Sequence, residues 1–102
     1  MLNQVIIVGR LKEIIKVDKD KLNLVVSVPQ SFKNKDGEYD VDLIDCEVIG
    51  GIADTTNEYC EIGKVIGVKG RLKIDYYSKD DEVIKIMKVY AEKISILTSK
   101  SE

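Results

Sequence analysis

The sequence predicts an all-β domain with one short helix. Five separate runs indicate strands, and in the runs over 22–28, 41–49 and 65–77 side chains alternate between two faces, a period of two that is typical of strands. Only residues 52–61 place apolar residues at helical spacing. The chain has 102 residues, about the length of one domain, and its 44% apolar and 33% charged residues are the composition of a globular protein.

The first three predicted strands lie in the N-terminal half. The first covers residues 5–11, where Gly9 suggests a bulge or a close approach of another backbone. The second covers residues 22–28, and a polar loop over 30–40 joins it to the third, residues 41–49. In the third strand, alternation turns the even positions inward and leaves the odd positions on the opposite face.

The helix and the last two strands follow. The helix is predicted over residues 52–61. The strand over 65–77 alternates most clearly, with the odd positions forming a basic face that ends in Tyr77. The even positions, which we expect to face the core, are Ile66, Val68, Gly70, Leu72, Ile74 and Tyr76. The final strand, residues 83–97, is expected to bend near residues 91–92.

This order of elements suggests one particular architecture. Five strands with a helix between the third and fourth are typical of the OB-fold, a five-stranded Greek-key β-barrel. We expect a single OB-fold domain over residues 1–98, followed by a short polar tail over 99–102. The fold commonly binds oligonucleotides or oligosaccharides, so the fold alone does not identify the ligand, and the evidence must come from individual residues.

The net charge at first argues against a nucleic-acid ligand. The chain has 16 basic and 18 acidic residues, a net charge of −2, whereas nucleic-acid-binding domains are usually basic. However, nine of the acidic residues and no basic ones lie in residues 36–61, which leaves a net charge of +7 for the rest of the chain. The sequence therefore contains two regions of opposite charge.

The basic face of the strand over 65–77 is the first candidate binding surface. Single-stranded nucleic acid needs cations for its phosphates and flat rings on which its bases stack. Lys69, Arg71 and Lys73 alternate on this face, and Tyr77 follows them. Further cationic or aromatic candidates are Arg10, Lys12, Phe32, Lys33, Lys35 and Tyr39. The alternative is a solvated outer strand face, on which alternate Lys and Arg are common.

No catalytic or metal-binding pattern stands out. The chain has no His, the commonest general base and metal ligand. Cys46 and Cys60 form no CxxC motif, and we expect two buried thiols. Four carboxylates in and beside the third strand complete no metal-binding loop, and we interpret them as a solvated acidic face. They are Asp40, Asp42, Asp45 and Glu47. We expect no cofactor, no metal and no enzymatic activity.

The chain also lacks the marks of membrane insertion or export. No apolar run approaches the 18 residues of a transmembrane helix. The N-terminus leads directly into a strand-like run, without the basic region or the small-residue cleavage site of a signal peptide. We therefore expect a cytoplasmic protein that does not bind membranes.

Short segments match one known family in order and spacing. They are NQVIIVGRL at 3–11, VPQSFKN at 28–34, GEY at 37–39, LIDC at 43–46, GIAD at 51–54, EYC at 58–60, Gly63, GVKGRL at 67–72 and VYAEK at 89–93. Each segment alone is weak, but the ordered series over about residues 2–98 resembles the bacterial single-stranded DNA-binding protein family.

This resemblance implies an OB-fold that binds single-stranded DNA without sequence preference and protects it during replication, recombination and repair. It also implies a homo-oligomer, a tetramer rather than a dimer, whose protomers pair largely through the first strand. Phe32 and Tyr77 match positions where the family stacks bases on aromatic rings. Leu43 and Ile49 stand where the family usually has Trp or Phe, so their contribution to base stacking is expected to be smaller.

Two departures from the family leave alternatives open. The chain stops at Glu102 without the Gly/Pro/Gln-rich linker and acidic tip of the family, so recruitment of replication proteins through a tail is not expected. Tailless relatives include the dimeric primosomal replication protein N group and paralogues on mobile elements. A second alternative is a protein-interaction OB module with weakened DNA binding, whose apolar patch would be Leu43 and Ile49 beside Asp45 and Glu47.

Overall fold

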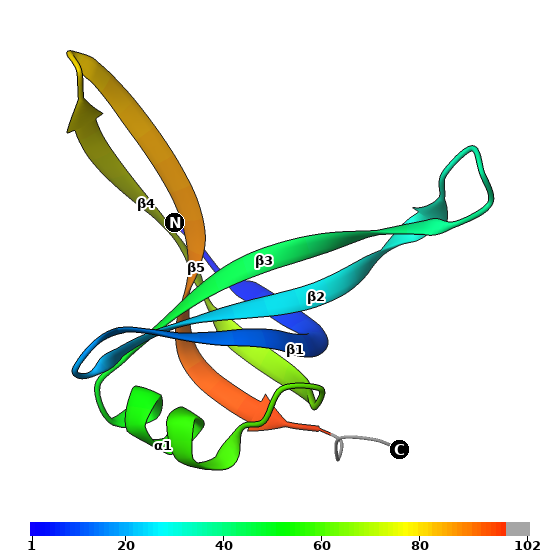
Figure 1. The fold of residues 1–102 in the computed structure, drawn as a ribbon, viewed down its shortest axis with the longest axis horizontal. Helices are drawn as coiled ribbons and strands as arrows, with labels where there is room; N and C mark the ends of the chain where they lie inside the picture. Colours follow the sequence, from blue (N-terminus) through cyan, green and yellow to red (C-terminus); the bar gives the residue numbers. More distant parts are fainter. Residues whose placement is uncertain (98–102) are drawn as a thin grey trace.

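A computed structural model describes residues 1–97 of the chain. It contains five strands and one helix in the order β1 (Val5–Asp18), β2 (Lys21–Lys33), β3 (Tyr39–Ile49), α1 (Gly51–Tyr59), β4 (Val65–Lys79) and β5 (Glu82–Ile96). The strands close into a barrel in the order β1-β2-β3-β5-β4 (Figure 1). This is the predicted OB-fold. Residue 98 and the predicted polar tail lie outside the described residues.

Four antiparallel pairings and one parallel pairing of strands close the barrel. All neighbouring strands are antiparallel except β3 and β5, which pair in parallel through Cys46 with Val89 and Glu47 with Tyr90. This parallel contact is short, and beyond it the two strands separate. Helix α1 lies across one end of the barrel, with Ala53 and Thr56 buried (Figure 1).

The core is aliphatic and lies inside the barrel. Its fully buried members include Leu11, Leu24, Val26, Cys46, Val48, Ile66, Val68 and Val89. Both cysteines are free and buried, as predicted. Desolvation, together with the nearby charge of Asp45, raises the pKa of the Cys46 thiol to about 12. The thiols therefore contribute to packing and are poor nucleophiles at neutral pH.

Two glycines allow backbones to approach closely at the barrel wall. A Cβ on Gly9 would lie 2.5 Å from the carbonyl oxygen of Ser27, which confirms the predicted close approach to β1. A Cβ on Gly70 would overlap the carbonyl oxygen of Tyr90. At this point Lys69 pairs with Lys93 and Gly70 with Ala91, so residue 92 is left over as a bulge, where the sequence predicted a bend in the final strand.

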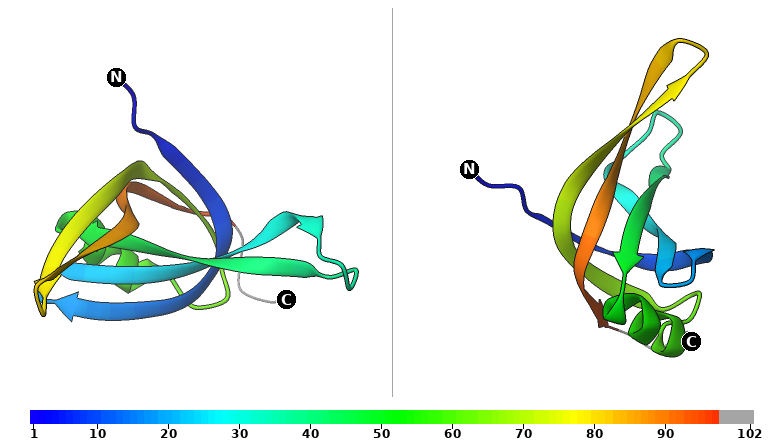
Figure 2. Two further views of the ribbon diagram at one scale, coloured as in Figure 1. Left: turned by 90° about the horizontal axis from the view of Figure 1, so that it is seen from above. Right: turned by 90° about the vertical axis from the view of Figure 1, so that its left-hand side faces the viewer.

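The strands extend beyond the barrel as two hairpin arms, one formed by β2 and β3 and the other by β4 and β5 (Figures 1 and 2). The prediction that the even positions of β4 all face the core is therefore wrong for Leu72, Ile74 and Tyr76, which are exposed. Alternation is regular along the whole strand, but no second layer covers this face once the hairpin leaves the barrel. The predicted strands and helix also differ from the observed ones at their ends, since β1 continues to Asp18 and α1 ends at Tyr59.

Candidate nucleic-acid interface

One outer face of the barrel collects residues from four strands. Directly paired residues of neighbouring strands project to the same side of a sheet. The pairs Asn23 with Glu47 and Glu47 with Tyr90 therefore join the odd positions of β3 to the outward side of β5. The pairs Arg71 with Tyr90 and Lys73 with Lys88 extend this face to the odd positions of β4. We call this surface the β2–β3–β5–β4 face.

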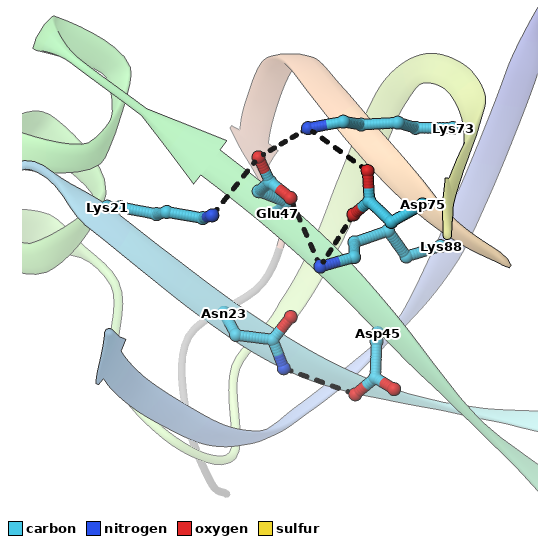
Figure 3. A network of polar contacts seen from close by, with 7 residues as sticks. All are labelled: Lys21, Asn23, Asp45, Glu47, Lys73, Asp75 and Lys88. Atoms are coloured by element: carbon cyan, nitrogen blue, oxygen red, sulfur yellow. Dashed lines mark hydrogen bonds and ion pairs between the residues drawn. The ribbon is translucent and has the colours of Figure 1, made fainter. Parts of the chain in front are cut away.

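A carboxylate surrounded by lysines occupies the middle of this face (Figure 3). Oε2 of Glu47 lies 3.1 Å from Nζ of Lys73 and 3.8 Å from Nζ of Lys21, while Oε1 lies 3.2 Å from Nζ of Lys88. Asp75 adds a second carboxylate, 3.9 Å from Lys73 and 3.5 Å from Lys88. We refer to these five side chains as the Glu47 network.

The network corrects the interpretation of the acidic segment. Glu47 was expected on a solvated acidic face, but its side chain is only 1% exposed. It projects outward as alternation predicts, and the lysines of β2, β4 and β5 then cover it. Its neighbour Asp45 remains exposed and accepts a hydrogen bond from Asn23 at 3.2 Å. Asp40 and Asp42 also lie exposed, on the β2–β3 arm.

The ion pairs determine the charge states of the network. Burial raises the pKa of Glu47, but the hydrogen bond from Lys73, the ion pair with Lys88 and the charge of Lys21 outweigh burial and hold that pKa below its usual value. Burial lowers the pKa of Lys88, and the ion pair with Glu47, with the charge of Asp75, raises it overall. Glu47 and Lys88 are therefore both charged at neutral pH.

The other cations of the predicted basic stripe are separated by the bulge. Arg71 lies over the ring of Tyr90, 4.7 Å from its centroid, and pairs with Glu92 at 3.3 Å. Lys69 precedes the bulge and pairs in register with Ile6 of β1, away from the Glu47 network. The cations of the predicted stripe form one row in the sequence, but Lys69 and Arg71 lie in different surroundings in the structure.

Arg10 has a structural partner of its own. Its guanidinium Nη1 donates a hydrogen bond of 2.6 Å to the carbonyl oxygen of Gly63, which ties β1 to the loop after α1. The structure therefore does not bring Arg10 together with the lysines of β4.

The β2–β3 arm presents aromatic rings near its tip. Phe32 is 82% exposed, and the neighbouring Lys33 pairs with Tyr39 across the hairpin, with Nζ 5.9 Å from the centroid of the exposed ring. The turn is closed by Asn34, whose Oδ1 accepts hydrogen bonds from the backbone amides of residues 36 and 38. A ring as exposed as that of Phe32 buries nothing in the domain and is free to contact a ligand.

The β4–β5 arm carries Tyr77, which is 49% exposed. Its two-residue turn consists of Asp80 and Asp81, both with positive φ, the backbone form that tight hairpins require. A groove lined by Leu43, Met87 and their neighbours lies where β3 and β5 separate, between the two arms at their barrel ends. Leu43 is 58% exposed, and Ile49 lies at the other end of the same row of β3, partly exposed.

The sequence missed three members of this face. Lys21, Lys88 and Tyr90 were not candidate site residues, although Tyr90 contacts the predicted Arg71, and Lys21 and Lys88 contact Glu47, the partner of the predicted Lys73. A turn at residues 80–81 would have aligned Lys88 with Lys73 and Tyr90 with Arg71, so the hairpin register was the available signal for two of them. Lys21 had no such signal.

Comparison with known proteins gives the family. The model of the single-strand binding protein family matches residues 2–97. The chain belongs to this family. A single-stranded DNA-binding protein of Streptococcus agalactiae is 35% identical to it, covering 100% of this chain and 82% of that protein. Single-stranded DNA-binding protein B of Bacillus subtilis is 30% identical, covering 98% of this chain and 94% of that protein.

The fold also agrees with solved structures of single-strand binding proteins. The Plasmodium falciparum SSB, solved in complex with ssDNA, superposes with a TM-score of 0.76 at 18% identity, covering 96% of each chain. The match of the family model confirms the family resemblance inferred from the ordered sequence motifs. In the described part of the chain, no helix is long and apolar enough to cross a membrane, and no group of three or more metal-ligating residues gathers.

Proposed function

We propose that this member of the single-strand binding protein family is a non-enzymatic protein that binds single-stranded DNA without sequence preference and protects it in replication, recombination and repair. The observation that carries the proposal is the placement of Phe32 and Tyr77. These exposed rings stand on two different arms, on either side of a face that contains lysines. Rings that stack on any base, next to cations that attract phosphates, provide binding without sequence readout.

Individual residues have distinct roles in this proposal. Phe32 and Tyr77 stack bases, with Tyr39 as a lesser partner. Leu43 and Ile49 pack against base faces and contribute less than aromatic rings would. The phosphate partners are Arg10, Lys33, Lys69, Arg71 and Lys73. Because Arg71 and Lys73 share their charge with carboxylates, we expect weaker binding than a free row of cations would give.

The proposed assembly is a homo-oligomer in the bacterial cytoplasm, a tetramer rather than a dimer. Exposed apolar residues of β1 support self-association: Ile6 and Val8 project outward and line one groove with Leu97. Burial of such a stripe against a second copy would stabilise the assembly. Solution mass with and without a long oligo-dT distinguishes dimer from tetramer.

Fluorescence anisotropy with labelled homopolymers tests the proposed activity. At low salt we expect binding to oligo-dT and oligo-dA of equal length, and much weaker binding to a duplex of that length. Absence of binding to both single strands at low salt, or a preference for the duplex, would overturn the proposal.

A second candidate is a protein-interaction module, related to the primosomal replication protein N group, in which DNA binding is weak. The apolar groove that contains Leu43 and Met87 favours it, because an exposed apolar groove suits a protein ligand. A protein partner that stays bound to the immobilised chain in excess oligo-dT would support this candidate. Release of that partner by oligo-dT would support the DNA-binding role.

A further inference from the structure

The Glu47 network has a geometry that the proposed DNA-binding role leaves unexplained. Lys21, Lys73 and Lys88 come from three different strands, and their ammonium groups converge on one carboxylate (Figure 3). The three lysines stand beside the row that contains Leu43 and Ile49, the positions proposed to contact bases. A DNA strand whose bases contact Leu43 and Ile49 would bring its phosphates within reach of the lysines.

The depth of each group matters for access. The carboxylate of Glu47 is 1% exposed, whereas the side chains of Lys21 and Lys73 are 35% and 34% exposed. Lys21 and Lys73 therefore form the rim, Lys88 lies deeper with 16% of its side chain exposed, and the carboxylate lies beneath all three. A second anion can approach the ammonium groups from solvent while their inner sides remain paired with Glu47. Carboxylate and phosphate oxygens accept charge-assisted hydrogen bonds from ammonium groups in the same manner.

The charge balance limits what this rim can attract. Three lysines face two carboxylates, Glu47 and Asp75, so the network carries a net charge of +1. With an uncharged residue in place of Glu47, the three ammonium groups and Asp75 would together carry a net charge of +2. Glu47 thus halves the positive charge that a DNA backbone meets at this point.

We infer that Lys21, Lys73 and Lys88 form a phosphate subsite for the backbone of single-stranded DNA, and that Glu47 acts as a built-in counter-ion that weakens it. The inference rests on the proposed function and adds Lys21 and Lys88 to the residues that contact DNA. Glu47 holds the three lysines in place and lowers affinity at the same time.

Glu47→Gln is the central test, because it keeps the size of the side chain and removes its charge. We expect about fivefold tighter binding to oligo-dT at low salt, the effect of one unit charge a few ångströms from a phosphate in water. The dependence of log affinity on log salt should steepen by about 1, since one more phosphate is neutralised. Glu58→Gln is the matched control: it makes the same change in net charge on the exposed surface of α1 and should change affinity little.

The outcomes separate this inference from the proposed function. If wild type binds and Glu47→Gln binds equally or more weakly while Glu58→Gln is unchanged, the inference fails and the function stands. If wild type does not bind but Glu47→Gln does, the proposed function fails and the inference is supported. If neither binds, both are wrong.

A second pair of variants decides the matter if Glu47→Gln does not fold. Asp75→Asn removes a carboxylate from the outer part of the same network, where the side chain is 27% exposed, and should raise affinity in the same direction by a smaller factor. Unchanged or weaker binding would overturn the inference. Lys21→Gln should weaken binding more than Lys19→Gln, which makes the same charge change in the neighbouring turn; equal effects would remove Lys21 from the subsite.

Discussion

Oε2 of Glu47 accepts a hydrogen bond of 3.1 Å from Nζ of Lys73, although the two residues are 26 positions apart and lie on strands β3 and β4, which do not pair with each other. Strand β5 lies between them and contributes Lys88 to the same carboxylate. Together these two contacts join three strands of the barrel across the face proposed to bind DNA. They couple the stability of the barrel to the charge of that face.

The stability of the protein should depend on pH through Glu47. Because its pKa is lower in the folded state than its ordinary value of 4.5, its ionised form stabilises the fold. This contribution is complete above about pH 4.5 and is lost as pH falls through the lower, folded pKa. The groups that face the carboxylate are Lys21, Lys73 and Lys88, with Asp75 on the far side of two of them.

Urea unfolding of wild type and Glu47→Gln at several pH values checks this. At pH 7 we expect the variant to be less stable by about 1–3 kcal/mol, the usual cost of losing buried charge-assisted hydrogen bonds. The difference should begin to shrink below about pH 4.5 and disappear as pH falls through the lowered, folded pKa of Glu47, because wild type then loses the same interaction. A difference that stays constant from pH 7 down to the pH at which wild type unfolds without urea would show that the ionised carboxylate is not the stabilising form.

Replacement of Leu43 by an aromatic residue should strengthen DNA binding. Leu43 is exposed on the row of β3 that is proposed to face the DNA, and an aromatic ring adds a stacking contribution of about 1–3 kcal/mol per base. Leu43→Trp should therefore bind oligo-dT at least several-fold more tightly in a fluorescence titration. Ile62→Trp, an exposed position in the loop after α1, is the control and should leave affinity unchanged. Equal affinities of the two variants would exclude Leu43 from the interface.

Gly70 and Gly67 should differ sharply in their tolerance of a methyl group. A Cβ at Gly70 would overlap the carbonyl oxygen of Tyr90, so the backbone of β4 or β5 must move. At Gly67 the nearest atom is a side-chain carbon of Leu97 at 3.6 Å, an ordinary contact. In thermal unfolding, Gly70→Ala should be destabilised by more than about 2 kcal/mol, as is typical of forced overlap, and Gly67→Ala by much less. Similar melting temperatures would contradict the close approach.

The two thiols should be inert in the folded protein. Burial raises the pKa of both cysteines, that of Cys46 to about 12, so very little thiolate is present at pH 8. A thiol reagent added at pH 8 should label neither residue in native buffer and both in urea, as measured by mass spectrometry. Rapid labelling of Cys46 in native buffer would show that the barrel opens at this strand.

Alternation predicted most of the fold, and its failures have a common cause. It identified β2, β3 and β4 and separated the two faces of β3 and β4, because period two is a local property of the chain, while β1 and β5 were predicted from their apolar runs. It could not show which faces are covered. Leu72, Ile74 and Tyr76 were assigned to the core since they share a face with Ile66 and Val68, but the barrel ends before they are reached.

The same distinction applies to the candidate site. The exposure of Phe32 and Tyr77 agrees with what the sequence predicted, whereas their roles and those of the cations remain proposals. Glu47 was misread because its lysine partners lie on other strands, up to 41 positions away, and only the register of the closed barrel brings them together. Long-range register is the information that local patterns lack.

The most direct measurement of the central claim compares oligo-dT binding by wild type and by the double variant Phe32→Ala/Tyr77→Ala at low salt. Both rings are exposed and support no packing in the core, so the double variant should melt like wild type and bind at least tenfold more weakly. Tyr59→Ala removes an exposed ring from α1 and should bind like wild type. Absence of binding by wild type, or equal binding by the double variant, would contradict the account.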